Sequence, residues 1–241
     1  LVPVYGSASS LLDPLRRLLT RPAPEADAIR AGLHWLFDLG TEEVEAVVGS
    51  VVEAVENAVD RRDDGVFRVD LAACAALGKG FPGDVGVVVS LLLNHVVLQP
   101  GQAMFLGPGM LHSYLGGFGV EVMANSDNVV RGGLTAKHVD VVELLGIVDT
   151  RPTAPVVQTA GPGAFRFESS VPEFALTRID FRAETSFVVR GPALVLVTSG
   201  AADLQTLGLV ERGQSVFVPA ADGPLTLDAE PGTLAWVARP G

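Results

Sequence analysis

The sequence has little of what several protein classes depend on. Only one of its 241 residues is a cysteine, Cys74, so no internal disulfide can form, which is typical of proteins of the reducing cytosol. No uninterrupted apolar run reaches the roughly 18 residues that a membrane-spanning helix needs. The first residues also lack the basic and apolar blocks of a signal peptide. We therefore expect a cytoplasmic protein without a membrane segment.

Positive charge is also scarce. The chain has 17 Lys and Arg against 28 Asp and Glu, its formal net charge is −11, and no basic stripe offsets this charge. Such a chain is a poor partner for nucleic acid, whose phosphates need clustered cations. An anionic small ligand would depend on local cations, and between Glu121 and Asp140 these are Arg131 and Lys137.

Residues from about 10 to 77 have the pattern of helices. After Thr41, which can cap a helix, two glutamates and a series of valines at helical spacing predict a helix with one buried face. Cys74 lies among small residues in LAACAAL, and we expect it to pack in the core without reactivity. We expect His34 to be a packing residue as well, rather than a ligand.

After residue 80 the sequence changes to short, β-rich apolar runs separated by Pro-Gly and Gly-rich turns. The runs 96–98 and 103–106 flank one such turn and predict a hairpin. A short helix is predicted over 139–147. The prolines and glycines between 152 and 163 predict a linker.

A second β-rich block follows this linker. Six short apolar runs alternate with turns at regular spacing, which is typical of a sandwich or barrel. These runs are 187–189, 193–197, 207–210, 215–218, 225–227 and 234–237. The block holds no histidine and no cysteine, so it offers no obvious metal site, and we interpret it as structural. The sequence as a whole predicts a mixed α and β fold.

Polar groups are dense between residues 91 and 137. From Gly101 onward the sequence follows G-x5-G-P-G-x2-H-x3-G, which resembles the second metal-binding motif of the cupin superfamily. Gly107 and Gly116 stand where that motif usually has proline and asparagine. The glycines let a strand bend so that a histidine can point into a barrel mouth. On this motif alone, His112 fits a metal ligand and a satisfied core histidine equally well.

The longer run from Phe81 to Lys137 resembles type I phosphomannose isomerase. Five motifs fall in that family's order: a PGD-G segment, an LLLN strand, PGQAMFL, the histidine bend, and VEVMANSDNVVRGGLTAK before a short helix. The resemblance implies a cupin-type β-sandwich (jelly roll) with an inserted helical domain and a second C-terminal β-sandwich. It divides the chain into a helical domain (1–80), part of the catalytic cupin domain (81–150) and a cupin-like β domain (151–241).

The resemblance also implies a zinc enzyme that interconverts mannose 6-phosphate and fructose 6-phosphate. His112 takes the place of a zinc-ligating histidine, and Arg131 takes the place of an active-site arginine. Four further residues fall on positions of the substrate pocket: Tyr114, Glu121, Asp127 and Lys137. The implied partner is a small phosphosugar, and we expect a monomer.

Elementary chemistry agrees with these roles. Moving a proton between adjacent sugar carbons requires stabilisation of an enediolate, which zinc and the permanently charged guanidinium of Arg131 can both supply. Asp127 fits a turn-forming role as well as a direct one. Glu121 fits the orientation of a neighbour better than the role of the base. His95 and His138 have no counterpart in the family, and we interpret both as structural.

One departure from the family pattern concerns zinc. The family takes its other zinc ligands from upstream Gln-x-His and Lys-Pro-Glu segments, and neither occurs in this sequence. Because a catalytic zinc site uses about three protein ligands, we expect the chain to be the C-terminal portion of an isomerase and inactive alone. One alternative is a non-enzymatic cupin that binds a sugar phosphate or a protein partner. Another is a metal-cupin oxygenase, but such an enzyme has no need of the SDNVVR and LTAK motifs.

Overall fold

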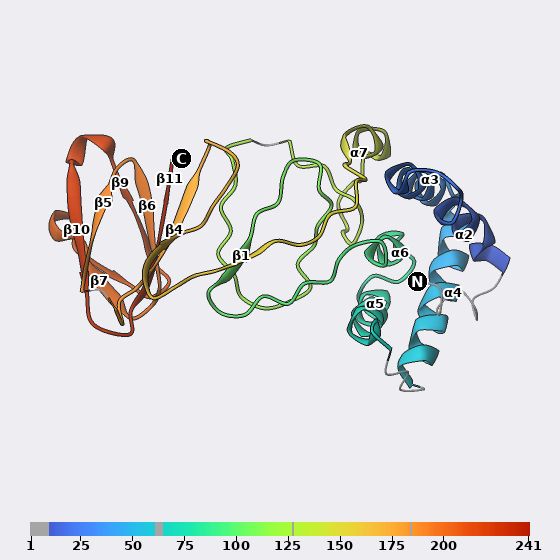
Figure 1. The fold of residues 1–241 in the computed structure, drawn as a ribbon, viewed down its shortest axis with the longest axis horizontal. Coiled ribbons are helices and arrows are strands. Elements are labelled where there is room, and N and C mark those ends of the chain that lie inside the picture. The colour runs from blue at the N-terminus through green and yellow to red at the C-terminus, as the bar shows by residue number, and fades with distance from the viewer. Residues whose placement is uncertain (1–9, 61–64, 127, 184) are drawn as a thin grey trace. The chain divides into compact units, whose positions relative to one another are not determined.

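The structure is a computed structural model that describes residues 10–60, 65–126, 128–183 and 185–241 (Figure 1). The chain divides into two compact units. The first contains the residues up to Val96 together with 106–117 and 128–155, and the second contains 97–105, 118–127 and 156–241. Within the described residues, no helix has both the length and the apolar character that a bilayer crossing requires.

The predicted helical block is confirmed. It contains η1 (Ser10–Leu12), α2 (Asp13–Leu19), α3 (Glu25–Phe37), α4 (Thr41–Asp60) and α5 (Arg68–Gly80). Helix α6 (Gly86–Ser90) was not predicted, because the short apolar runs after residue 80 favoured β structure. Helix α4 buries its valine face almost completely, with Val51 1% and Val55 0% exposed. Thr41 is the first helical residue and not the cap. The Glu43 side chain instead accepts a 2.9 Å hydrogen bond from the Gly40 N–H, as in a capping box.

Two single-residue expectations for this block have opposite outcomes. Cys74 is 1% exposed in the core, and its burial raises the pKa of the thiol to about 11, so it is a packing residue as predicted. The expectation for His34 is wrong, because this side chain is exposed on α3. The buried positions of that stretch are Leu33 and Leu36, which leaves the ring between them facing water.

The predicted short helix after residue 139 is also confirmed, as α7 (Val141–Ile147). Asp140 caps it by accepting a 3.0 Å hydrogen bond from the Glu143 N–H. At the other end, Arg30 of α3 donates to the carbonyl oxygens of Leu145 at 3.2 Å and Val148 at 3.1 Å. These bonds satisfy carbonyl groups that a helix C-terminus leaves unpaired, so α7 is fixed to the helical block.

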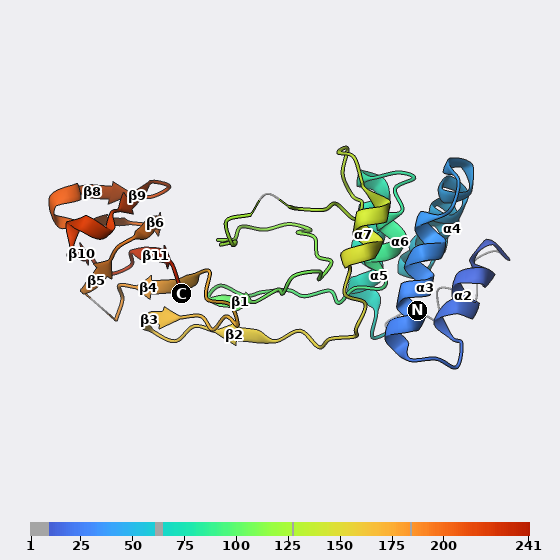
Figure 2. The same ribbon diagram turned by 90° about the horizontal axis from the view of Figure 1, so that it is seen from above.

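The predicted hairpin is wrong. Residues 96–98 form no strand, and β1 (Gln102–Met104) pairs antiparallel with β2 (Val157–Thr159), as Figure 2 shows. Because β2 lies between 152 and 163, the linker prediction is wrong for its residues. The LLLN run is not a strand either, since Leu91–Leu93 form a turn after α6. Short apolar runs indicate a buried segment, but the available partner decides whether a strand forms.

The rest of the second unit consists of two antiparallel sheets (Figure 1). In the five-stranded sheet the order is β3 (Gly163–Arg166), β4 (Ala175–Asp180), β11 (Leu234–Arg239), β6 (Ala193–Ser199) and β9 (Ser215–Val218). In the four-stranded sheet the order is β5 (Ser186–Arg190), β10 (Pro224–Ala229), β7 (Ala201–Asp203) and β8 (Leu209–Glu211). All six predicted strands are present, whereas β3, β4 and β7 were not predicted.

Side chains alternate between the two faces of these strands. On β6, Val195 and Val197 are 0% exposed in the core while Leu194 is 52% exposed, the period of two that a half-buried strand requires. Asp180 is a buried carboxylate that pairs with Arg178 at 3.1 Å and with Arg182 at 2.6 Å. Two arginines therefore neutralise the one buried acidic group of β4.

Candidate functional site

His112 lies on a bend without regular secondary structure, and its ring is exposed. Its Nδ1 atom is 3.0 Å from the carbonyl oxygen of Met110. The ring meets that of Tyr114 edge-on, with centroids 6.2 Å apart. In the tautomer that carries its proton on Nδ1, this contact is a hydrogen bond and the Nε2 lone pair stays available. Proteins orient metal-ligating histidines in the same way, through a carbonyl on the second ring nitrogen.

The bend that carries His112 is fixed to the end of α7. Gly109 has φ +77°, and a Cβ at this position would lie 2.7 Å from the carbonyl oxygen of Ile147. The N–H of Asp149 donates to the Gly109 carbonyl at 2.9 Å. Only glycine combines this backbone conformation with so close an approach. The hydrogen bonds that Asp149 accepts from Arg151 lower the pKa of its carboxyl to about 2.

Arg131 and Lys137 lie on a second loop, and both side chains are exposed. Within the described residues, neither takes part in a salt bridge. Both side chains are accessible to an anionic group.

The two loops touch. A Cβ on Gly132 would lie 3.0 Å from Cδ2 of Leu111 and 3.8 Å from Cδ1 of Leu144. Gly132 follows Arg131 and Leu111 precedes His112, so the structure brings the two motifs together against α7. The sequence did not predict this contact. The sequence feature that could have indicated it is the Gly-Gly pair directly after Arg131.

The remaining predicted residues are less closely assembled. Tyr114 is 73% exposed beside His112. Glu121 is exposed and belongs to the second unit. Asp127 lies outside the described residues. Among the residues that the structure describes, no three His, Cys, Asp or Glu side chains gather closely enough to hold a metal ion. His112 fits zinc as one ligand and not as a complete set.

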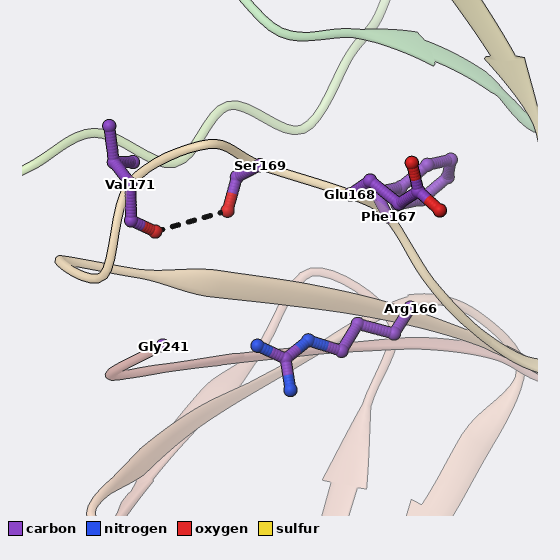
Figure 3. Close-up of a pocket in the computed structure, with 6 residues that line it drawn as sticks. All are labelled: Arg166, Phe167, Glu168, Ser169, Val171 and Gly241. Atoms are coloured by element: carbon purple, nitrogen blue, oxygen red, sulfur yellow. Dashed lines mark hydrogen bonds between the residues drawn. The ribbon is translucent and has the colours of Figure 1, made fainter.

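Among the described residues, two hollows are lined by none of these side chains. One in the second unit, of about 410 Å³, is shown in Figure 3 and is lined by Arg166, Phe167, Glu168, Ser169, Val171 and Gly241. Its charged groups, Arg166 and Glu168, are both exposed. The other, of about 220 Å³, is apolar, belongs to the first unit and is lined by Leu36, Phe37, Val44, Asp84, Val85, Gly133, Val139 and Val141. Neither contains a predicted site residue.

Known proteins resemble this chain in sequence and in structure. No protein-family model matches the chain. The mannose-6-phosphate isomerase of Salmonella typhimurium is 33% identical over 237 residues, which cover 93% of this chain and 56% of that protein. The chain is thus similar to a mannose-6-phosphate isomerase over nearly its whole length. The Escherichia coli isomerase is 40% identical over 173 residues, which cover 67% of this chain and 43% of that protein. The chain spans about half the length of these relatives and matches their C-terminal part.

Solved structures give the same result. The Salmonella typhimurium isomerase bound to fructose 6-phosphate and zinc superposes with a TM-score of 0.67 and 26% identity, covering 96% of this chain and 60% of that one. A zinc-bound mannose 6-phosphate isomerase superposes with a TM-score of 0.69 and 26% identity, covering 99% and 59%. The resemblance and the mixed fold with antiparallel sheets are therefore confirmed.

Proposed function

We propose that this chain is part of a zinc-dependent isomerase that interconverts mannose 6-phosphate and fructose 6-phosphate. The identity of 33% over 93% of the chain carries this proposal. The contact between the His112 bend and the Arg131 loop supports it, because the proposed metal ligand and the proposed catalytic cation lie on adjoining segments.

The reaction moves a proton between two adjacent sugar carbons, and negative charge develops on oxygen as it does so. A fixed positive group beside that oxygen lowers the barrier, because it needs no reorganisation when the charge appears. Arg131 is the catalytic residue that we assign to this role. Bound zinc would polarise the sugar oxygens, and Nε2 of His112 would hold it on one side.

The other candidate residues bind substrate in this proposal. Lys137 is a mobile point charge on a long stem, which suits a phosphate group at the far end of the sugar. Tyr114 lies beside the metal ligand, where its hydroxyl can meet a sugar hydroxyl. Glu121 and Asp127 complete the set on the evidence of the motif alone.

The zinc site requires further ligands. A catalytic zinc ion usually has about three protein ligands, so we propose that the others come from the portion of the isomerases that this chain does not span. The same proposal includes the cupin-type sandwich, with a helical domain over 1–80, part of the catalytic domain over 81–150 and a cupin-like domain over 151–241. A cytoplasmic location and a monomeric state remain predictions of the sequence.

The native polypeptide that carries this sequence provides the test. We expect it to convert mannose 6-phosphate in a coupled assay and to bind one zinc ion per chain. His112→Ala should lose the zinc, measured by metal analysis of the purified protein. His34→Ala is the matched control, because His34 is an exposed histidine on a helix. Unchanged zinc in His112→Ala would remove this ligand, and a zinc-loaded protein without turnover would favour the non-enzymatic alternative.

A further inference from the structure

Three consecutive residues after Arg131 pack against other parts of the first unit. Gly132 packs on Leu111 and Leu144, as described above. Gly133 lies against the segment from Asp84 to Gly86, and Leu134 packs against the helical core. A loop with exposed charged side chains would need only one such contact to stay attached. Three in succession fix its backbone.

The approach between Gly133 and Gly86 leaves no room for a side chain on either. A Cβ on Gly133 would lie 2.9 Å from Cα of Gly86 and 2.9 Å from Oδ1 of Asp84. A Cβ on Gly86 would lie 2.9 Å from the backbone nitrogen of Leu134. The contacts with Cα of Gly86 and with the nitrogen of Leu134 involve backbone atoms, which cannot rotate away as a side chain can. Asp84 fixes the geometry further, since its Oδ1 accepts a 2.7 Å hydrogen bond from the Gly86 N–H.

The backbone at this point is also strained. Gly133 has φ +119°, and Leu134 has φ +53°, which a residue with a branched side chain rarely adopts. Such a conformation persists only where the surrounding structure over-determines it, and it is found preferentially at functional sites. Here the strained residue lies between Arg131 and Lys137.

We propose that Asp84, Gly86, Gly133 and Leu134 form a loop anchor that positions Arg131 beside the bend carrying His112. They are positioning residues, because they act through Arg131 and do not touch the substrate. This inference rests on the function proposed above. It follows physically because an error of about 1 Å in the placement of a catalytic group can lower a rate about 10²-fold.

The central variant is Gly86→Ala in the native polypeptide. Its methyl group must displace the backbone at Leu134, and the apolar hollow that Gly133 borders gives the loop room to shift while the helices remain folded. We expect kcat to fall about 10- to 100-fold with a smaller change in KM and an unchanged circular dichroism spectrum. Gly49→Ala on α4 is the matched control, because nothing lies within 4 Å of a Cβ at that position. The control should keep the wild-type kcat.

A second pair of variants covers the case in which Gly86→Ala fails to fold. Asp84→Asn keeps an oxygen that can accept from the Gly86 N–H, whereas Asp84→Ala removes it. Asp84→Ala should reproduce the loss of kcat, and Asp84→Asn should restore most of it. Equal kcat in wild type, Asp84→Ala and Gly86→Ala would overturn the proposal.

A readout that does not depend on turnover separates this inference from the proposed function. Amide resonances of 109–112 and 131–134 in the 241-residue chain should shift in Gly86→Ala, while those of α3 and α4 should not. If these shifts appear while the native polypeptide lacks isomerase activity, the anchor stands and the proposed function fails. Unshifted resonances at 131–134 would overturn the anchor whatever the activity.

Discussion

Strands β3 to β11 form two sheets that share one apolar core, which we call the sandwich. The sandwich and the segment from 94 to 140 contain similar short apolar runs, yet they differ in how those runs are paired. In the sandwich, each of the nine strands β3 to β11 has at least one hydrogen-bonded neighbour in its own sheet. Among the described residues of 94–140, only β1 is a strand. Large apolar side chains remain in water there, with Phe118 91%, Val97 64% and Met123 57% exposed.

The same segment carries every residue that we assign to the isomerase site. Contiguous exposed apolar surface, unlike single exposed side chains, often marks a contact with another polypeptide segment. The sandwich holds none of the assigned residues and completes its own pairing. We therefore predict that the region with the proposed chemistry depends on other residues for β partners, whereas the sandwich does not.

The largest expected effect of that dependence is on the activity of the isolated chain. The purified 241-residue chain should not measurably isomerise mannose 6-phosphate even with added zinc, because His112 is one ligand of the about three that catalytic zinc needs. A coupled assay beside a known mannose-6-phosphate isomerase measures this. Turnover near that of the known enzyme would mean that the chain holds a complete site and that the comparison is wrong.

Hydrogen exchange tests the comparison directly. Amides of β6 and β11, which are interior strands of the sandwich, should exchange at least about 10³-fold more slowly than those of 111–126, because unpaired surface segments open at almost no free-energy cost. Mass spectrometry of the 241-residue chain can resolve both. Similar rates would show that 111–126 has partners and that its exposure is not a property of the chain in solution.

The buried ion pairs of Asp180 allow the stability of the sandwich to be tested by itself. Removing this buried carboxylate in Asp180→Ala leaves Arg178 without its partner and should destabilise the sandwich by roughly 3 kcal/mol. Denaturant unfolding measures this in a Trp35→Phe background, where Trp236 of β11 reports the sandwich alone. Asp222→Ala, an exposed aspartate of the same unit, is the control and should change little.

The same aspartate makes the sandwich sensitive to acid. Hydrogen bonds from Arg182, and then from Arg178, hold the pKa of Asp180 well below its usual range. A carboxyl group whose pKa is lower in the folded than in the unfolded state stabilises the fold at pH values above its unfolded-state pKa. For aspartate this unfolded-state pKa is about 4. This stability should be lost progressively as pH falls below about 4. Asp180→Ala should show a weaker dependence on pH over the same range, and an equal dependence would contradict the assignment.

Variants of Arg131 and Lys137 test the roles proposed for the segment from 94 to 140. In the native polypeptide, Arg131→Ala should lower kcat about 10²-fold with a smaller change in KM, the effect of removing one donor to a developing oxyanion. Lys137→Ala should mainly raise KM, because a phosphate contact binds substrate and transition state alike. Steady-state kinetics on both variants checks this. The reverse pattern would exchange the two roles.

Local patterns predicted the elements whose apolar residues repeat with the period of a helix or a strand. The valine spacing of α4 and the alternating runs of the sandwich were sufficient, because those side chains pack on neighbouring elements of the same block. Strand β4 was missed because Arg178 and Asp180 interrupt its apolar pattern. The hairpin at 96–106 failed because β1 pairs with residues more than fifty positions away. The site residues came from motif resemblance, and the contact of Gly132 with Leu111 is tertiary and has no local pattern.

The bonds from Arg30 to the end of α7 have a consequence for the order in which the protein is made. Their acceptors lie 115 and 118 residues further along the chain. A ribosome adds about 5–20 residues per second, so α3 exists for several seconds before its partner carbonyls emerge. During that interval the Arg30 guanidinium has neither of these acceptors and is hydrated by water. The first unit can close only after Val148 has left the ribosome, although most of its helices come from the first ninety residues.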